Sequence, residues 1–273
     1  EIITTKKDNN IGEKQLEIFE RNLKQNIENS KRYKRIYSLD EIKNFYVDDV
    51  TEKYEKVKVA GDIHSCGTAL EKYLEDFDEK TLYVFCGDYF DRGIEHNKTW
   101  EIVKELVKKP NVIMLEGNHE KHILNYCNGE VINSSSARET FTELEKYNVT
   151  KEELRDFYNS LKEYYCFSIF NKNYFCCHGG LSFVPDRLRL TSTHTFTKGV
   201  GSYETEIDEI YASNFEKGMC RDFIQVHGHR KTTSTGYSYC LEGAVEFGGK
   251  LMFMGTKPNK VYVDGISNKI CPA

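Results

Sequence analysis

Three short apolar runs stand out in the first half of the chain, and each ends in a glycine followed by a polar residue. They are KVKVAGD at 56–62, TLYVFCGD at 81–88 and NVIMLEGN at 111–118. Short runs rich in β-branched and aromatic residues predict buried strands. The segments 68–77 and 97–109 between them carry apolar residues at helical intervals. This alternation predicts a parallel sheet with helices on its faces.

The second half carries shorter β-like segments with glycine or asparagine at the turns. They read YCFSIF, KNYFCCHGG, DFIQVHGH, GYSYCLEG, AVEFGG, KLMFMG and KVYVDG. We expect them to form a second, largely antiparallel sheet. Residues 130–165 are polar with a helical pattern, and Thr150 with Glu153 fits a capping box. They predict an inserted helical cap that forms a wall or lid over a site.

The N-terminal region has a different pattern. Apolar residues recur at near-helical spacing over 11–29, which predicts one amphipathic helix. We therefore expect residues 1–50 to be a helical lead-in, with the tail of a preceding module as one interpretation. Residues 51–273 are expected to form one domain, because a chain of 273 residues with 39% apolar content supports one substantial core. The first residue is not methionine, which suggests a segment of a larger parent polypeptide.

Composition indicates the cellular compartment and excludes some classes of partner. Nine cysteines spread over 273 residues favour reduced thiols rather than a disulfide scaffold. No uncharged apolar stretch approaches the roughly 20 residues that cross a bilayer, and no signal peptide opens the chain. We predict a cytoplasmic protein without membrane contact. A formal charge of −5 argues against a surface that binds nucleic acid by bulk electrostatics.

Polar side chains gather where the predicted strands end. Five clusters follow strands: GDIHS at 61–65, GDYFDRG at 87–93, GNHE at 117–120, HGG at 178–180 and HGHR at 227–230. A lone GD or HG pair is usually a turn, but five clusters of Asp, His and Asn at strand ends predict a site. Their mixed oxygen and imidazole donors suit Mn, Fe or Zn ions. Asp62 and His64 are two apart on extended chain and point the same way, and Asp88 is placed to bridge two ions.

This ordered set of motifs resembles the calcineurin-like metallophosphoesterases over residues 56 to about 250. The forms GDYFDRG and GNHE are similar to the branch that contains serine/threonine protein phosphatases. The resemblance implies an α/β fold, a two-sheet β-sandwich with flanking helices and a helical insertion. It also implies two divalent metal ions, with Mn expected and Fe, Zn or Ni as alternatives. The implied ligands are Asp62 and His64 on one ion, Asn118, His178 and His229 on the other, and Asp88 on both.

The same resemblance implies roles for the remaining motif residues. Arg92 would bind the substrate phosphate, His119 would protonate the leaving oxygen, and Asp91 would orient His119. Asn118 would also contact substrate. His227 is expected behind the ligands or at the substrate, with a direct ligand role as the alternative, and Arg230 is expected either at the phosphate or facing solvent. We expect His96, His122 and His194 to be ordinary surface or capping histidines.

Two segments bear on the substrate. Residues 20–46 resemble the segment that joins kinase to phosphatase in bacterial polynucleotide kinase-phosphatases. YCLEGAVEFGGKL at 239–251 is similar to the strand pair that closes the phosphatase module there and in related bacterial and phage phosphatases. An Asp common in those proteins is replaced here by Leu241 or Glu242. The chain is therefore predicted to be a phosphomonoesterase acting on phosphorylated nucleic-acid ends. Alternatives are a serine/threonine protein phosphatase, a dinucleoside polyphosphate hydrolase, or an inactive phosphate-binding module.

Overall fold

The computed structural model describes residues 2–4, 21, 36–38, 45–230, 234–258 and 260–271. Its contacts divide the chain into two units. Unit 1 comprises residues 1–46 and 185–191, and its strand β1 (Ile2–Thr4) pairs in parallel with β2 (Ile36–Ser38). The helix predicted over 11–29 lies outside the described residues, apart from Arg21. Unit 2 comprises residues 47–184 and 192–273 and contains two five-stranded sheets.

The first sheet of unit 2 contains the parallel strands expected from the three apolar runs. β4 (Lys56–Ala60) pairs with β5 (Thr81–Phe85), and β5 pairs with β6 (Val112–Met114). Helices α3 (Gly67–Tyr73) and α4 (His96–Leu106) connect them. The predicted β-α-β-α-β order is therefore confirmed. Because the strands are parallel, the three Gly-polar turns end at the same edge of the sheet.

Two further strands complete this sheet, in the order β12-β11-β4-β5-β6. β11 (Lys250–Lys257) runs antiparallel to β4 and to β12 (Lys260–Ser267). The prediction that both belong to the second sheet was wrong. β4 is buried along almost its whole length, so it cannot be an edge strand, and β11 covers its free side. The AVEFGG segment forms the 3-10 turn η2 (Val245–Phe247) instead of a strand.

The second sheet has the order β10-β9-β8-β7-β3. Its strands are β3 (Asp48–Asp49), β7 (Tyr164–Ile169), β8 (Lys172–Cys177), β9 (Ile224–His227) and β10 (Ser238–Cys240). Among its described strand pairs only β7–β8 is antiparallel, so the expected largely antiparallel sheet is wrong. The reason is the connection: α8 (Thr193–Lys198) and α9 (Ile207–Glu216) lie between β8 and β9 and form a crossover rather than a hairpin.

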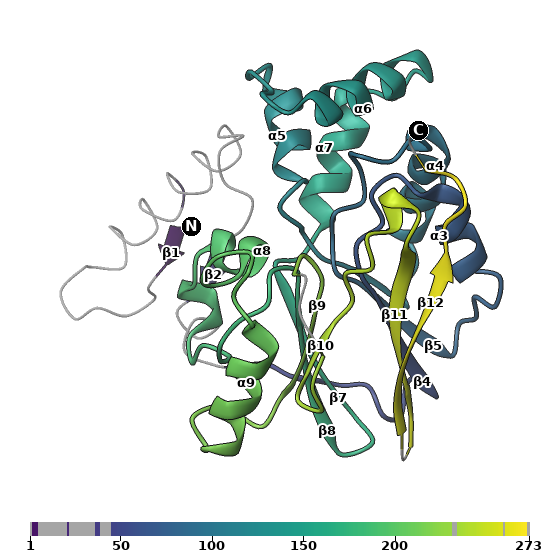
Figure 1. Cartoon of the computed structure of the whole chain (residues 1–273). Helices are drawn as coiled ribbons and strands as arrows, with labels where there is room; N and C mark the ends of the chain where they lie inside the picture. Colours follow the sequence, from purple (N-terminus) through teal and green to yellow (C-terminus); the bar gives the residue numbers. More distant parts are fainter. Residues whose placement is uncertain are drawn as a thin grey trace. The chain divides into compact units, whose positions relative to one another are not determined.

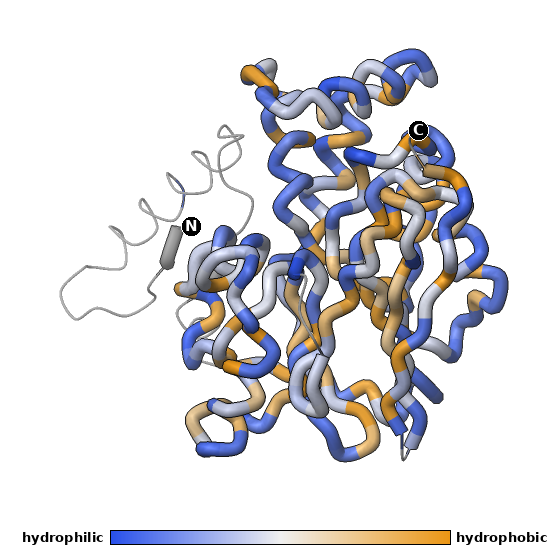
Figure 2. Tube along the Cα trace, in the orientation of Figure 1, coloured by the Kyte–Doolittle hydropathy of each residue, from blue (hydrophilic) through white to orange (hydrophobic). Residues whose placement is uncertain are grey.

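The two sheets share one apolar core between them. Val57, Val59 and Val84 lie in this core with Phe167 and Val226 of the second sheet. Figure 2 shows apolar positions concentrated in the strands, and Figure 1 shows α3 and α4 beside one sheet and α9 beside the other. Burying each large apolar side chain contributes about 1.5–3 kcal/mol. The predicted two-sheet α/β fold with flanking helices is confirmed.

The predicted polar insertion is helical. The predicted range 130–165 contains α6 (Ser135–Lys146) and α7 (Lys151–Ser160), and α5 (Lys121–Asn128) precedes it; these helices follow β6 and stand together in Figure 1. The capping box is present, since the Glu153 amide donates to the Thr150 hydroxyl and the Glu153 carboxylate accepts from the Thr150 amide. Within the described ranges, no helix is both long enough and apolar enough to span a membrane.

Candidate functional site

The side chains that follow the strands meet around the carboxylate of Asp88. Its Oδ2 lies 3.2 Å from Nε2 of His178 and 3.6 Å from Nε2 of His64. Nε2 of His119 is 4.0 Å away from the same oxygen. These residues follow the ends of β4, β5, β6 and β8, so the turns of both sheets contribute to one cluster. Asp88 is 1% exposed, so the cluster is buried.

The donors fall into two groups that share Asp88. His64, Asp88 and His119 form one, and Asp88, His178 and His229 form the other; in each, the candidate ligand atoms lie within 4.8 Å of one another. Asn118 belongs with the second group, because its Oδ1 lies 3.0 Å from Nε2 of His178. This set of carboxylate, amide and imidazole donors fits divalent metal ions.

Hydrogen bonds to the backbone orient two of the imidazoles. Nδ1 of His64 lies 3.0 Å from the carbonyl oxygen of Phe90, and Nδ1 of His178 lies 3.0 Å from that of Cys86. A carbonyl only accepts, so each Nδ1 carries the hydrogen. The lone pair of each Nε2 is then available to a metal ion. Ligand histidines are commonly oriented in this way.

Burial sets the charge of the imidazoles. It lowers the pKa of His64, although the charge of Asp88 opposes it. Burial and the neighbouring His178 lower the pKa of His229 to about 3. Both rings are therefore neutral near pH 7, which is the form that binds metal.

The carboxylates respond differently to the same burial. For Asp88 burial raises the pKa, but the imidazoles of His178 and His119 outweigh it and hold the pKa well below its ordinary value. For Asp62 burial raises the pKa, and the charges of Glu242 and Asp88 raise it further. Two carboxylates held close together need a proton or a cation between them.

Backbone strain is concentrated at the cluster. Positive φ angles occur at His64 (43°), Asp88 (53°), Asp91 (71°), Arg92 (64°) and His229 (60°). Non-glycine residues rarely adopt this left-handed region, and each such residue costs about 1–3 kcal/mol. The surrounding structure therefore holds these side chains in positions that the local chain would not choose.

Close backbone contacts explain two of the glycines. A Cβ at Gly117 would lie 2.2 Å from Oδ1 of Asp88, and a Cβ at Gly228 would lie 1.9 Å from Oδ1 of Asp62. Any side chain at either position would displace a carboxylate of the cluster. The glycines expected to permit tight turns thus also allow the backbone to approach the ligands.

Glu120 joins two of these turns. Its buried carboxylate accepts hydrogen bonds from the amides of Asp88 (2.9 Å), Tyr89 (2.9 Å) and Gly117 (2.7 Å). The turns after β5 and β6 are thereby fixed to each other. The GNHE motif contains Glu120, but no local pattern indicated that it would link the two turns.

His119 is held from the side opposite the cluster. Its Nδ1 lies 2.7 Å from Oδ2 of Asp91, and Oδ1 of Asp91 is 2.9 Å from the hydroxyl of Thr140 on α6. Asp91 therefore contacts the ring on this side, and Thr140 of the helical insertion contacts Asp91. Burial lowers the pKa of His119, but the charges of Asp88 and Asp91 outweigh burial and raise it.

Arg92 lies at the exposed edge of the cluster. Its side chain is 41% exposed, and Nη1 lies 3.0 Å from Oε1 of Glu246 and 3.3 Å from Nε2 of His64. Glu246 itself is 1% exposed, and its Oε2 is buried without a hydrogen-bond partner among the described residues. Glu246 was not among the predicted site residues, because the resemblance of residues 239–251 indicated closing strands rather than a turn of η2 that faces the cluster.

Glu246 and Glu242 both come from residues 241–249, here called the crossing loop. This loop leaves β10 in the second sheet and enters β11 in the first. The Leu241 carbonyl packs against Gly61, where a Cβ would lie 2.1 Å from the carbonyl oxygen. The loop therefore passes directly over the end of β4. There Glu242, Asp62 and His64 place candidate ligand atoms within 4.8 Å of one another.

His227 and Arg230 are turned toward other partners. Nδ1 of His227 lies 2.8 Å from the Gly228 carbonyl, and Nε2 lies 3.0 Å from Oδ1 of Asp208 on α9. The buried Arg230 guanidinium donates to four carbonyls, those of Gly179, Lys198, Val200 and Ser202. These contacts fix loops of the second sheet. We therefore do not propose either residue as a substrate contact.

Two histidines expected on the surface lie close to the cluster. His96 is 3% exposed, and its Nδ1 lies 2.7 Å from the hydroxyl of Ser65. The ring of His122 lies 5.8 Å from that of His119, and its Nδ1 is buried with no hydrogen-bond partner in the part of the chain that the structure describes. His194 is an exposed residue of α8. The expectation of a surface or capping histidine was wrong for His96 in its surface alternative, because tertiary packing covers the start of α4, where His96 is the first residue.

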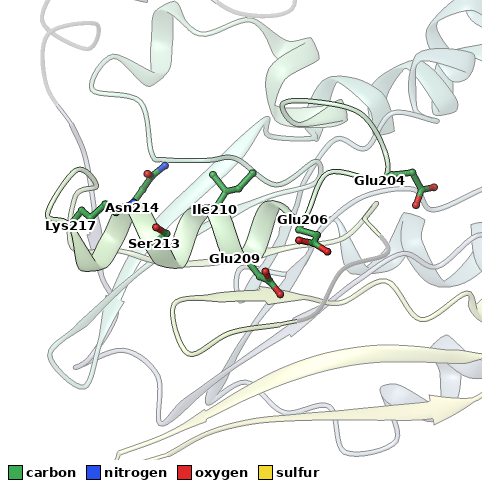
Figure 3. Close-up of a pocket in the computed structure, with 7 residues that line it drawn as sticks. All are labelled: Glu204, Glu206, Glu209, Ile210, Ser213, Asn214 and Lys217. Atoms are coloured by element: carbon green, nitrogen blue, oxygen red, sulfur yellow. The ribbon is translucent and has the colours of Figure 1, made fainter.

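A separate groove lies along α9 and differs in chemistry from the cluster. Figure 3 shows the side chains that line it: Glu204, Glu206, Glu209, Ile210, Ser213, Asn214 and Lys217. Three carboxylates and one ammonium would repel a phosphate group. We therefore assign the candidate site to the cluster around Asp88.

Comparison with known proteins gives one family match. The family model described as calcineurin-like phosphoesterase matches residues 55–255. Several solved structures are similar in fold. One, provisionally described as a diadenosine tetraphosphatase, is 18% identical with a TM-score of 0.56, covering 80% of this chain and 97% of that one.

Two other structures show the same likeness. A serine/threonine phosphatase from Saccharomyces cerevisiae with similarity to human PP5 is 16% identical, with a TM-score of 0.53 and coverage of 83% and 84%. A cold-active protein-tyrosine phosphatase from a psychrophilic Shewanella is 17% identical, with a TM-score of 0.52 and coverage of 83% and 84%. At identities of 16–18% the likeness shows a shared fold and no more.

Proposed function

Because the chain belongs to the calcineurin-like phosphoesterase family and is a metal-dependent phosphatase, we propose that it hydrolyses phosphomonoesters at the cluster around Asp88. The single observation that carries the proposal is the shared position of Asp88 between two groups of candidate ligands. Asp62, His64, Asn118, His178 and His229 complete the proposed ligand set. Ions bound there would lower the pKa of a water and clamp the entering and leaving oxygens.

The residues of the chain supply binding and proton transfer. Arg92 is exposed beside His64, so its guanidinium can grip phosphoryl oxygens that enter the site. Nε2 of His119 points toward Asp88 and can donate a proton, because Asp91 engages Nδ1. The charges of Asp88 and Asp91 raise the pKa of this imidazole, which favours the protonated form that a general acid requires. Thr140 and Asp91 hold the ring in place.

The proposal is tested with purified protein, Mn²⁺ and a generic aryl phosphate. We expect hydrolysis that disappears on chelation and returns with added Mn²⁺, with Fe²⁺, Zn²⁺ and Ni²⁺ as further trials. Absence of hydrolysis with every one of these ions would favour an inactive binding module instead.

For the substrate, we propose phosphorylated nucleic-acid ends. Support comes from the resemblance of residues 239–251 to the closing strands of polynucleotide phosphatase modules. It also comes from Tyr203, which is 46% exposed and whose ring lies 5.9 Å from that of His229. An exposed aromatic ring beside the phosphate site can stack with a base.

The second candidate is a serine/threonine protein phosphatase, which the GDYFDRG and GNHE motifs favour. A 3′-phosphorylated oligonucleotide, a phosphoserine peptide and a dinucleoside tetraphosphate distinguish the candidates by kcat/KM. We expect Tyr203→Ala to raise KM for the oligonucleotide and to leave KM for the peptide unchanged. A clear preference of the native protein for the peptide would defeat the nucleic-acid proposal.

A further inference from the structure

The two candidate metal positions differ in a way that the motifs did not indicate. The second position draws on Asp88, Asn118, His178 and His229, which supply two imidazoles. The first draws on Asp62, His64 and Asp88, because His119 of that group is proposed as the proton donor and not as a ligand, and the crossing loop brings a further carboxylate to it. The candidate ligand atoms of Glu242, Asp62 and His64 lie within 4.8 Å of one another.

Glu242 is held at this place by the fold. The Leu241 amide donates to the His227 carbonyl at 2.7 Å, which ties the loop to the second sheet. The Leu241 carbonyl packs against Gly61 on the other side. One carboxylate oxygen of Glu242 accepts from the Ala244 amide at 2.5 Å. The carboxylate is thus anchored by its own loop beside Asp62.

We propose that Glu242 is a further ligand of the first metal ion, which makes that position richer in oxygen than the second, where two imidazoles stand beside Asp88 and Asn118. This inference rests on the proposed function. Two carboxylates as close as Asp62 and Glu242 repel each other, and a divalent cation between them removes the repulsion. Three carboxylates with one imidazole favour Mn²⁺ or Mg²⁺ at the first position. The imidazole-rich second position accepts Zn²⁺ or Fe²⁺ more readily.

The test measures metal binding rather than activity. The full chain is stripped with chelator, and Mn²⁺ is titrated by calorimetry into the native protein, Glu242→Gln, Glu242→Asp and the control Glu204→Gln. Glu204 is an exposed glutamate outside the cluster, so its substitution matches the loss of charge. Circular dichroism and thermal unfolding verify that each variant folds.

We expect two binding events in the native protein and in Glu204→Gln. In Glu242→Gln one event should weaken by roughly 10- to 100-fold while the other stays unchanged. Glu242→Asp keeps the charge but has a shorter side chain, so its affinity for this Mn²⁺ ion should lie between those of the native protein and Glu242→Gln. A parallel titration with Zn²⁺ should show a smaller weakening of the same event, because Zn²⁺ depends less on carboxylate ligands.

Native affinities for both events in folded Glu242→Gln would overturn the inference and leave the proposed function intact. Absence of both events in the native protein would instead remove the proposed function. The two failures are therefore distinguishable.

Discussion

The turns that follow β4, β5 and β6 and the crossing loop (residues 241–249) reach the same cluster by different routes. The turns carry their ligands directly at the ends of parallel strands, as Asp62 and Asp88 do. The crossing loop runs between the two sheets and brings Glu242 and Glu246 to the cluster from outside the parallel strands. The position of the ligands in the turns can be predicted from local sequence. The position of Glu242 and Glu246 depends on the path of the crossing loop in the folded protein.

The strand-end turns and the crossing loop also differ in how firmly their acidic side chains are held. Asp88 is fixed by strained backbone and by Glu120, which accepts from amides of two turns. Glu246 is buried, with its Oε1 3.9 Å from Nε2 of His64, but its nearer partner at 3.0 Å is Arg92, whose side chain is 41% exposed. We therefore expect substitutions in the strand-end turns to cost more than those in the crossing loop.

The largest effect is expected for Asp88→Asn. The residue stands in both groups of candidate ligands, so its loss weakens both proposed metal positions. Since metal ions contribute several kcal/mol to transition-state stabilisation, kcat/KM should fall roughly 1000-fold or more. Elemental analysis should show less bound metal, whereas Asp156→Asn on the exposed face of α7 should leave metal and activity unchanged. Full metal content in Asp88→Asn would contradict the bridging position.

His119→Ala should come next, with kcat lowered by roughly 100- to 10,000-fold and metal content unchanged. An alkyl phosphate should show the larger loss, because its leaving oxygen needs the proton more than that of an aryl phosphate. Steady-state kinetics with both esters measures the difference, and equal turnover in the native protein and the variant would remove His119 from its proposed role.

The pH dependence of kcat tests the role of Asp91 through the variant Asp91→Asn. The raised pKa of His119 means that the protonated acid persists above its ordinary range and that kcat falls as pH rises through that pKa. Removing the Asp91 charge should shift this basic limb to lower pH. If kcat of Asp91→Asn fell over the same pH range as that of the native protein, Asp91 would not set the pKa of His119.

Glu120→Ala should act on stability. Three buried amides would lose their acceptor, so the free energy of unfolding should fall by about 3 kcal/mol or more. For a chain of this size that corresponds to a Tm lower by roughly 6–12 °C. Glu75→Ala, at an exposed position after α3, is the control and should leave Tm unchanged. Equal Tm values for both variants would show that the two turns hold without Glu120.

The smallest effect is expected for Glu246→Gln in the crossing loop. Arg92 loses its charged partner, so KM should rise roughly 3- to 10-fold while kcat changes less than about 2-fold. Steady-state kinetics of this variant beside Arg92→Ala, which should raise KM further, measures the difference. A loss in kcat as large as that of Asp88→Asn would remove the contrast between the two regions.

The parallel strands, the polar residues at their ends and the family could all be predicted from the order of the amino acids. An apolar run followed by glycine and a ligand is a local signal, and the covalent chain carries the ligand to the end of its own strand. Local pattern therefore suffices to place Asp62, Asp88 and Asn118 at one edge of a sheet. The link from Asp91 to His119 also followed, through the resemblance of the motif.

Tertiary packing alone settles which sheet β11 joins, where His227 and Arg230 point, and that Glu242 and Glu246 reach the cluster. Strand pairing and loop paths depend on contacts between residues far apart in the chain, and local hydrophobic pattern does not encode such contacts. A glutamate in a turn looks the same in sequence whether it faces water or a buried imidazole. Its surroundings are set by the packing of the two sheets.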